Sequence, residues 1–167
     1  MFQKSTQTDL DKRLIDFIRN AGYKRPTLLQ QSVLPQTLLG RDIAIEAGPG
    51  EGRTGLLIIS LLIQLAGRGD GLRSLVIVSG PSEVYKVMRQ YRRFSARFHG
   101  RPHIVGLGTD ENVAKETKLL ARNPDIAVGT SQRIIDHLRR ESISLQNVQI
   151  VTLIVPEKGE LEGFEKD

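Results

Sequence analysis

Apolar residues alternate along this chain between a helical spacing and a strand-like spacing. Apolar positions three and four residues apart, typical of one helix face, predict helices over residues 11–21, 29–39, 53–66, 82–98, 111–123 and 131–140. Short runs rich in Val and Ile predict strands at residues 43–46, 75–79, 103–105, 126–128 and 148–155. These runs lack polar alternation, which is typical of strands buried on both faces of a parallel sheet. The pattern predicts an α/β fold, a doubly wound and largely parallel sheet of about five or more strands flanked by helices.

Loops with candidate chemistry follow several of these strands. Residues 47–54 read Ala-Gly-Pro-Gly-Glu-Gly-Arg-Thr and join the first predicted strand to a long apolar helix. Glycines in such a loop let backbone N–H groups surround phosphate oxygens, and the helix N-terminus adds positive potential. A working phosphate-binding loop has a lysine followed by Ser or Thr, where this chain has Arg53 and Thr54. Residues 80–83 and 129–133 also follow strands, so all three loops should share the carboxyl edge of the sheet.

Length and composition limit the class of protein. A chain of 167 residues is large enough for a single core, and no linker-like stretch divides residues 1–167, so we expect one domain with a flexible start at residues 1–10. The absence of cysteine excludes disulfides and thiolate metal sites. No apolar run approaches the roughly 18 residues that cross a bilayer, and the start lacks the apolar region of a signal peptide. We therefore expect an intracellular protein, cytoplasmic or nuclear, without a membrane partner.

Positive charge gathers in one predicted helix. The formal net charge is +5, and no carboxylate interrupts the basic residues Lys86, Arg89, Arg92, Arg93, Arg97 and Arg101. At 100° per residue, the apolar side chains gather on the opposite face: Val84, Val87, Met88, Tyr91, Phe94 and Phe98. Two interpretations remain open, a solvated face of an amphipathic helix and a surface that contacts phosphates.

The order of these motifs resembles the first RecA-like domain of DEAD-box RNA helicases. Residues 22–31, Gly-Tyr-Lys-Arg-Pro-Thr-Leu-Leu-Gln-Gln, resemble the Q motif of that family, in which a glutamine reads the adenine edge and an upstream aromatic stacks on the base. The candidate aromatic here is Phe2, since the helical pattern places Phe17 on a buried face. The alternative for Gln30 is a plain polar residue at a helix start. The resemblance implies nucleotide binding by Tyr23, Arg25, Gln30, Gly50, Gly52, Arg53 and Thr54.

Three further motifs correspond to RNA-binding elements of the family. Gly80-Pro81-Ser82-Glu83-Val84 stands where the family has Pro-Thr-Arg-Glu-Leu, Leu107-Gly108-Thr109 stands for its Gly-Gly element, and Thr130-Ser131-Gln132-Arg133 stands for Thr-Pro-Gly-Arg. Such elements contact sugar and phosphate, which is the chemistry of sequence-independent binding. The resemblance implies RNA contacts from Pro81, Ser82, Glu83, Gly108, Thr130 and Arg133, although about half of the family's polar contacts are lost.

The catalytic box of the family is degenerate. Aligning Gly163-Phe164 with the Gly-Phe that follows the Asp-Glu-Ala-Asp box places the box on Ile154, Val155, Pro156 and Glu157. Neither the metal-holding aspartate nor the glutamate that activates water is present, so we expect no catalytic residue and no metal site. With Arg53 and the carboxylate of Glu51 in the loop, ATP and Mg²⁺ are not assigned as cofactors. Two nearby carboxylates, Glu160 and Glu162, are expected to be exposed to solvent.

Two weaker signals complete the sequence. Residues 4–8, Lys-Ser-Thr-Gln-Thr, resemble a peptide that docks to dynein light chain by strand addition, with a polar disordered start as the alternative. His99, His103 and His137 show no ligand spacing and are interpreted as structural or surface residues.

The sequence thus predicts a degenerate DEAD-box domain of the RecA-like P-loop type that serves as an RNA- or protein-binding scaffold in an RNA pathway. The second RecA-like domain that unwinding requires is absent from this chain. One alternative is an ATP-dependent RNA helicase domain that turns over when joined to a second RecA-like domain. The other is a purely protein-interaction domain.

Overall fold

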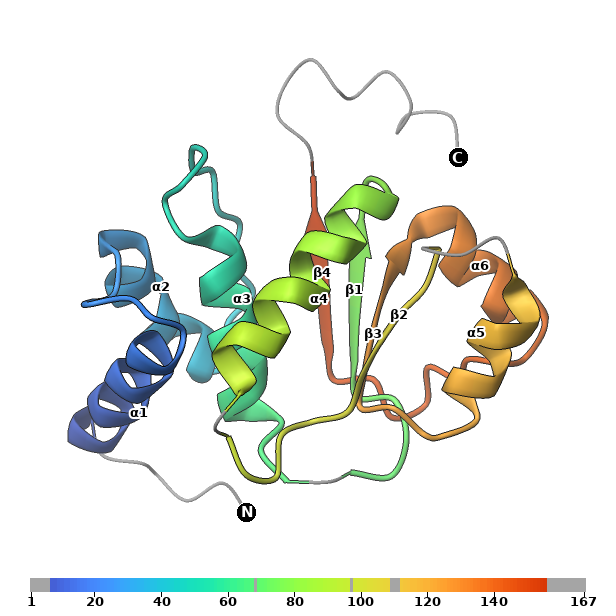
Figure 1. The fold of residues 1–167 in the computed structure, drawn as a ribbon, viewed down its shortest axis with the longest axis horizontal. Helices are drawn as coiled ribbons and strands as arrows, with labels where there is room; N and C mark the ends of the chain where they lie inside the picture. Colours follow the sequence, from blue (N-terminus) through green and yellow to red (C-terminus); the bar gives the residue numbers. More distant parts are fainter. Residues whose placement is uncertain (1–6, 68, 97, 109–111, 156–167) are drawn as a thin grey trace. The chain divides into compact units, whose positions relative to one another are not determined.

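The computed structural model describes residues 7–67, 69–96, 98–108 and 112–155. The elements in chain order are α1 (Gln7–Asn20), α2 (Leu28–Leu38), α3 (Arg53–Gln64), β1 (Ser74–Val78), α4 (Pro81–Ser95), β2 (Ile104–Gly106), α5 (Val113–Leu120), β3 (Ile126–Thr130), α6 (Ser131–Arg139) and β4 (Ile150–Ile154). Helices and strands alternate from α3 onward (Figure 1).

The chain divides into two compact units, which we describe separately. The N-terminal unit comprises the chain up to Ala66 together with Gln90–Arg101, and it contains α1, α2, α3 and the end of α4. The sheet unit comprises Gly67–Arg89 and the chain from Pro102 onward. The prediction of a single domain is not tested by this division.

A parallel sheet forms the centre of the sheet unit. Its strand order is β2-β3-β1-β4, and all its pairs are parallel. Val78 at the end of β1 lies opposite Thr130 of β3 and Ile154 of β4. The predicted α/β class with a parallel sheet flanked by helices is confirmed, although four strands form among the described residues rather than five or more.

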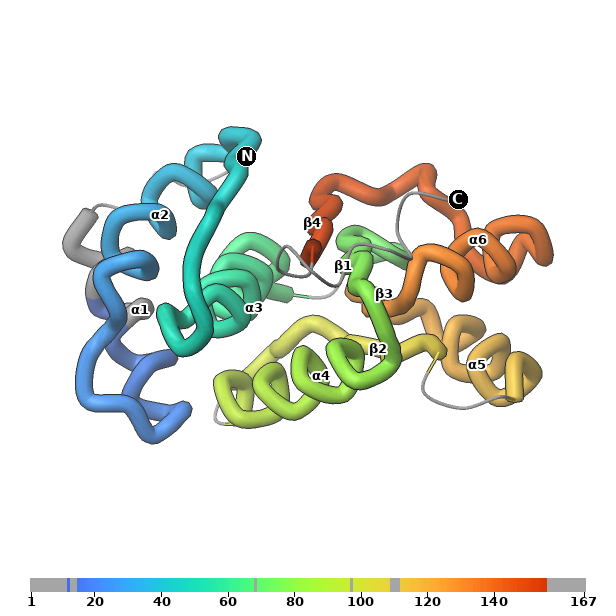
Figure 2. The backbone as a smooth tube through the Cα atoms, turned by 90° about the horizontal axis from the view of Figure 1, so that it is seen from above, coloured from blue at the N-terminus to red at the C-terminus, as the bar shows by residue number. Residues whose placement is uncertain are grey.

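Helices cover both faces of this sheet (Figure 2). On one face, the first turns of α4 approach β2 so closely that a Cβ added to Gly106 would lie 3.0 Å from a methyl carbon of Val84. On the other face, α6 packs against β3, since a Cβ at Gly129 would lie 3.2 Å from Ile134. Because side chains alternate between the faces of a strand, successive residues along β1 and along β3 pack on opposite faces of the sheet.

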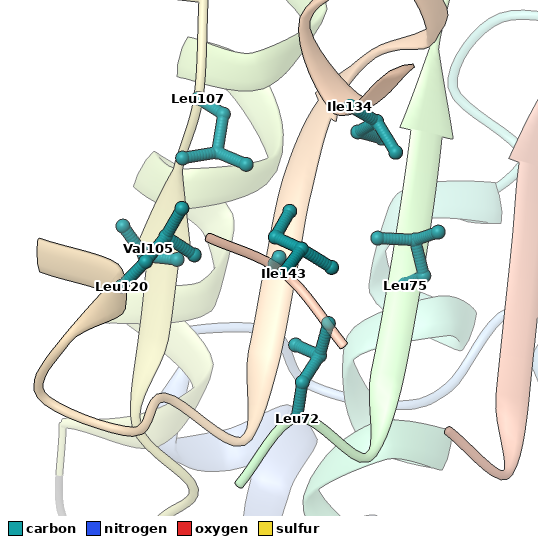
Figure 3. Packing of buried hydrophobic residues seen from close by; sticks show 8 residues of the cluster. Leu72, Leu75, Val105, Leu107, Leu120, Ile134 and Ile143 are labelled. Atoms are coloured by element: carbon teal, nitrogen blue, oxygen red, sulfur yellow. The ribbon is translucent and has the colours of Figure 1, made fainter. Parts of the chain in front are cut away.

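A cluster of buried apolar residues joins α5 and α6 to the sheet (Figure 3). Leu75 of β1, Val105 of β2 and Ala127 of β3 contribute from the strands, with Leu120 and Ile134 from the helices. The sheet continues past this cluster at β4, where Val151 and Leu153 remain 62% and 54% exposed. The core is therefore centred on β3 and β1, and β4 carries an open apolar face.

The strand predicted at residues 43–46 does not form. Residues 41–48 have no regular secondary structure, and Ile43 and Ile45 are 38% and 40% exposed. A strand exists only where a neighbour completes its hydrogen-bond ladder, and apolar content alone does not supply that neighbour. The other predicted strands form with bounds shifted by a few residues.

No helix in the described ranges has the length and apolar character that crossing a membrane requires.

A buried ion pair between Asp125 and Arg73 lies at the amino edge of the sheet. Asp125, which is 2% exposed, precedes β3 and accepts hydrogen bonds from Arg73 Nη2 at 2.6 Å and from the backbone N–H of His103 at 2.7 Å. It also accepts a bond from the backbone N–H of Gly69 at 3.2 Å. One carboxylate therefore holds together the chain segments that enter β1, β2 and β3.

We expect Asp125→Ala to destabilise the protein by about 3–5 kcal/mol, because it removes the carboxylate that pairs with a largely buried guanidinium and leaves two backbone donors without that acceptor. Urea denaturation measures the change. Asp136→Ala is the matched control, since Asp136 pairs with Arg140 on an exposed helix turn and should cost less than about 1 kcal/mol. Equal losses in the two variants would contradict the role assigned to Asp125.

Candidate functional site

In the N-terminal unit, the Q-motif-like segment (residues 22–31) forms hydrogen bonds with the phosphate-binding-like loop (residues 47–54). Thr27 is the N-cap of α2 and forms a capping box with Gln30. The Thr27 hydroxyl donates a hydrogen bond to the carbonyl of Glu51 at 2.8 Å, and Gln30 Nε2 donates to the carbonyl of Gly52 at 3.2 Å. The two side chains thus hold successive carbonyls of the loop just before α3 begins.

The amide of Gln30 is already engaged on both sides. Its Oε1 accepts from the backbone N–H of Thr27 at 3.1 Å while its Nε2 binds Gly52, and the residue is 4% exposed. The contacts that the structure gives this side chain are with the backbone of its own helix cap and of the loop. A role in reading a base remains a prediction.

The loop has the backbone conformation of a tight turn and altered side chains. Gly50 and Gly52 adopt φ values of +82° and +92°, which favour glycine. Arg53 is the first residue of α3, and its side chain is exposed. Thr54 follows it and is half-buried. The carboxylate of Glu51 folds over the loop, so that a Cβ added at Gly48 would lie 3.7 Å from its Oε1. A negative group therefore lies along the loop that would receive phosphates.

Tyr23 packs within the N-terminal unit. Its ring stacks on Phe94 with 6.0 Å between centroids, and the guanidinium of Arg93 lies 4.6 Å from the ring centroid. Arg25 is exposed. Phe17 is 4% exposed, which confirms its predicted buried position, whereas Phe2 lies outside the described residues.

The predicted RNA-binding residues follow adjacent strands of the sheet unit. Pro81 and Ser82 begin α4 just after β1 and are exposed, and Glu83 forms an ion pair with Lys86 one turn later. Thr130 ends β3 opposite Val78 of β1. These residues therefore share the carboxyl edge of the sheet, as predicted. The phosphate-binding-like loop belongs to the other unit, and its place on that edge remains a prediction.

Gly108, Thr130 and Arg133 come together at this edge. Gly108 has φ +84°, and a Cβ there would lie 3.5 Å from Thr130 Oγ1 and 3.7 Å from Arg133 Cβ. Thr130 caps α6, with its hydroxyl accepting from the backbone N–H of Arg133 at 3.4 Å. Two motifs separated by more than twenty residues in the sequence thus form one cluster of a backbone turn, a hydroxyl and a guanidinium.

A buried polar network supports this cluster, and sequence reasoning missed it. Glu116 of α5 is 2% exposed; its Oε1 accepts from the N–H of Gly108 at 2.7 Å, and its Oε2 lies 3.6 Å from Arg133 Nε. His137 of α6 is fully buried, with its Nε2 2.8 Å from Glu116 Oε2 and its Nδ1 2.8 Å from Ser142 Oγ. The available signal was spacing, because Glu116 lies between Val113 and Leu120 on the inward face of α5.

The other histidines and the degenerate box take simpler positions. His137 proves structural, while His99 and His103 are exposed. Ile154 ends β4 at the carboxyl edge, and Val155 is 44% exposed. Pro156, Glu157, Glu160 and Glu162 lie outside the described residues, as do residues 4–6 of the candidate docking peptide. Within the described ranges, no group of three or more His, Asp or Glu residues could hold a metal ion.

The parallel sheet, the glycine loop before α3 and the motifs at the carboxyl edge define the class of protein as an α/β domain of the RecA-like type. A model of the DEAD/DEAH box helicase family matches residues 27–162, and the chain belongs to that family.

Relatives and solved structures agree with this assignment. The chain is 26% identical over 158 residues to the ATP-dependent RNA helicase CshA of Listeria monocytogenes serovar 1/2a, covering 95% of this chain and 30% of that protein. A DEAD box protein from the hyperthermophile Methanococcus jannaschii superposes with a TM-score of 0.79 at 26% identity, covering 98% of this chain and 43% of that one. Yeast Prp28, a DEAD-box splicing factor, shares the fold with a TM-score of 0.77 at 19% identity, covering 91% and 38%. The chain therefore spans less than half the length of these proteins.

Substitutions of Gly50 and Gly52 test how closely Thr27 and Gln30 pack against the loop. We expect Gly52→Ala to cost at least about 2 kcal/mol, because a left-handed φ is strained for alanine. In addition, its Cβ would lie 2.7 Å from Gln30 Nε2 and 2.9 Å from Thr27 Oγ1. Gly50→Ala has the same kind of φ but meets nothing within 4 Å, so only the strain of about 1 kcal/mol applies. Thermal unfolding of both variants gives the comparison, and a larger loss in Gly50→Ala would contradict this packing.

Proposed function

We propose that this chain is a catalytically degenerate DEAD-box domain that binds single-stranded RNA without hydrolysing ATP, as a scaffold in an RNA pathway. The observation that carries the proposal is the cluster of Gly108, Thr130 and Arg133, held in place by the buried Glu116. A hydroxyl, a guanidinium and a tight backbone turn at one sheet edge suit sugar-phosphate contacts that are independent of sequence.

The residues at the family's nucleotide-binding and catalytic positions fit ATP and Mg²⁺ poorly. Arg53 stands where the compact ammonium of lysine normally neutralises phosphate, and its planar fork is not equivalent. The carboxylate of Glu51 lies against Gly48 of the loop. At the end of β4, the side chain of Ile154 offers no oxygen to a metal ion, and the side chain of Val155 cannot act as a base. Loss of the general base alone costs about 10²–10⁴ in rate.

An ATP-dependent helicase domain is the second candidate. Thr54 is retained at the start of α3, and Gly50 and Gly52 keep the turn conformation that a phosphate-binding loop requires. These features favour a loop that still admits a nucleotide when a second RecA-like domain is present. They do not replace the missing acidic residues.

Calorimetry with ATP, with and without Mg²⁺, separates the two candidates. We expect no binding heat from the unaltered chain, and Mg²⁺-dependent binding by the variant Arg53→Lys/Ile154→Asp/Val155→Glu, because the loop backbone is already formed. Mg²⁺-enhanced micromolar binding of ATP by the unaltered chain would reverse the order of the two candidates.

RNA binding tests the proposal directly. We expect Arg133→Ala to weaken binding of a single-stranded RNA of about six nucleotides and to reduce the log–log salt slope by about 0.7, the contribution of one phosphate contact. Fluorescence anisotropy at several salt concentrations measures both. Arg139→Ala, which removes an exposed cation from the last turn of the same helix, should change neither value. A slope near zero for the unaltered chain would reject phosphate contacts, and no binding of RNA at all would leave a protein-interaction domain.

A further inference from the structure

The outward side of the first turns of α4 carries an aromatic ring among positive charges. Ser82, Tyr85, Lys86 and Arg89 are spaced three and four residues apart, so they share one side of the helix; we call these four residues the α4 outer face. All four are exposed. Val84 and Val87 point the other way and are 0% and 1% exposed.

Tyr85 is the distinctive residue of this face. It is 58% exposed, although α4 buries Val84 directly beside it. A single exposed aromatic needs no functional explanation by itself. The surroundings of Tyr85 do suggest a function, because Lys86 and Arg89 occupy the adjacent positions on the same side of the helix.

Apart from Glu83, the charged residues near Tyr85 in the sequence are all positive. Glu83 and Lys86 form an ion pair in which their charges offset each other, and no Asp or Glu occurs from Val84 through Thr109. An anionic partner would therefore meet cations with no carboxylate of α4 beyond Glu83 to repel it. Aromatic rings next to cations are the combination that binds single-stranded nucleic acid, by stacking on bases and neutralising phosphates.

The α4 outer face is continuous with the candidate RNA-binding edge. Ser82 belongs to both, since α4 begins at Pro81 directly after the carboxyl end of β1. From Ser82 to Arg89 the helix rises about 10 Å, which extends the surface beyond the reach of the edge itself.

We propose that the α4 outer face extends the RNA-binding edge, with Tyr85 stacking on a base and Arg89 contacting a phosphate of the same single strand. This extension rests on the proposed RNA binding at Gly108, Thr130 and Arg133. It assigns the basic helix, which the sequence left open between two interpretations, to a nucleic-acid surface.

The test compares two RNA lengths, about six and about twelve nucleotides, by anisotropy. The longer RNA should bind more tightly to the unaltered chain. Tyr85→Ala should reduce affinity for the longer RNA about tenfold and leave the shorter RNA unchanged, whereas Tyr85→Phe should retain the affinity. Arg89→Ala should reduce the salt slope for the longer RNA by about 0.7. Lys118→Ala, which removes an exposed cation from α5, is the control and should have no effect.

A tryptophan reporter gives an independent readout. The chain contains no Trp, so Tyr85→Trp introduces a single tryptophan, on the α4 outer face, whose emission can be excited selectively. The longer RNA should quench its emission through stacking, and the shorter RNA should not.

The outcomes distinguish this inference from the function on which it rests. If the shorter RNA binds but the longer RNA gains neither affinity nor quenching, the extension is wrong and the proposed function stands. If neither RNA binds, both are wrong. A tenfold loss in Tyr85→Ala confined to the longer RNA, with unchanged Lys118→Ala, would support the extension.

Discussion

Parallel pairing of β1 with both β3 and β4 is the constraint on which the sheet unit depends. The register places Val78 beside Thr130 and Ile154, so the three strands end together. Because the strands are parallel, the segments that follow them emerge at one edge. The start of α4, the start of α6 and Ile154 therefore lie near one another, although they are far apart in the sequence.

A buried carboxylate forms hydrogen bonds near each edge of this sheet, and the two have different roles. Asp125 at the amino edge binds Arg73 and the backbone of the segments that enter the strands. Glu116 near the carboxyl edge binds the backbone of Gly108 and reaches Arg133. Each accepts from N–H groups that the sheet ladder leaves without a partner, which buried backbone requires. The first arrangement stabilises the sheet, and the second also orients the candidate site.

The residues that hold the phosphate-binding-like loop are separate from those that would act on a phosphate. Thr27 and Gln30 bind the loop carbonyls, and Gly52 leaves the space that their side chains occupy. None of these contacts involves the side chain of Arg53. The loop conformation therefore depends on different atoms from those that would neutralise a phosphate.

The sequence by itself determined the helices, most strands, the α/β class and the burial of Phe17, because these follow from local apolar spacing. The order of motifs also indicated the family. Only the tertiary structure decided the rest. Residues 43–46 have strand-like composition but no ladder partner, so no strand forms. Gln30 was recognised as a motif residue, yet its contacts with Gly52 depend on how α2 meets the loop. Glu116 and His137 look like ordinary polar helix residues, and only packing brings them together. Periodicity is local, whereas hydrogen-bond partners are set by segments that are distant in the chain.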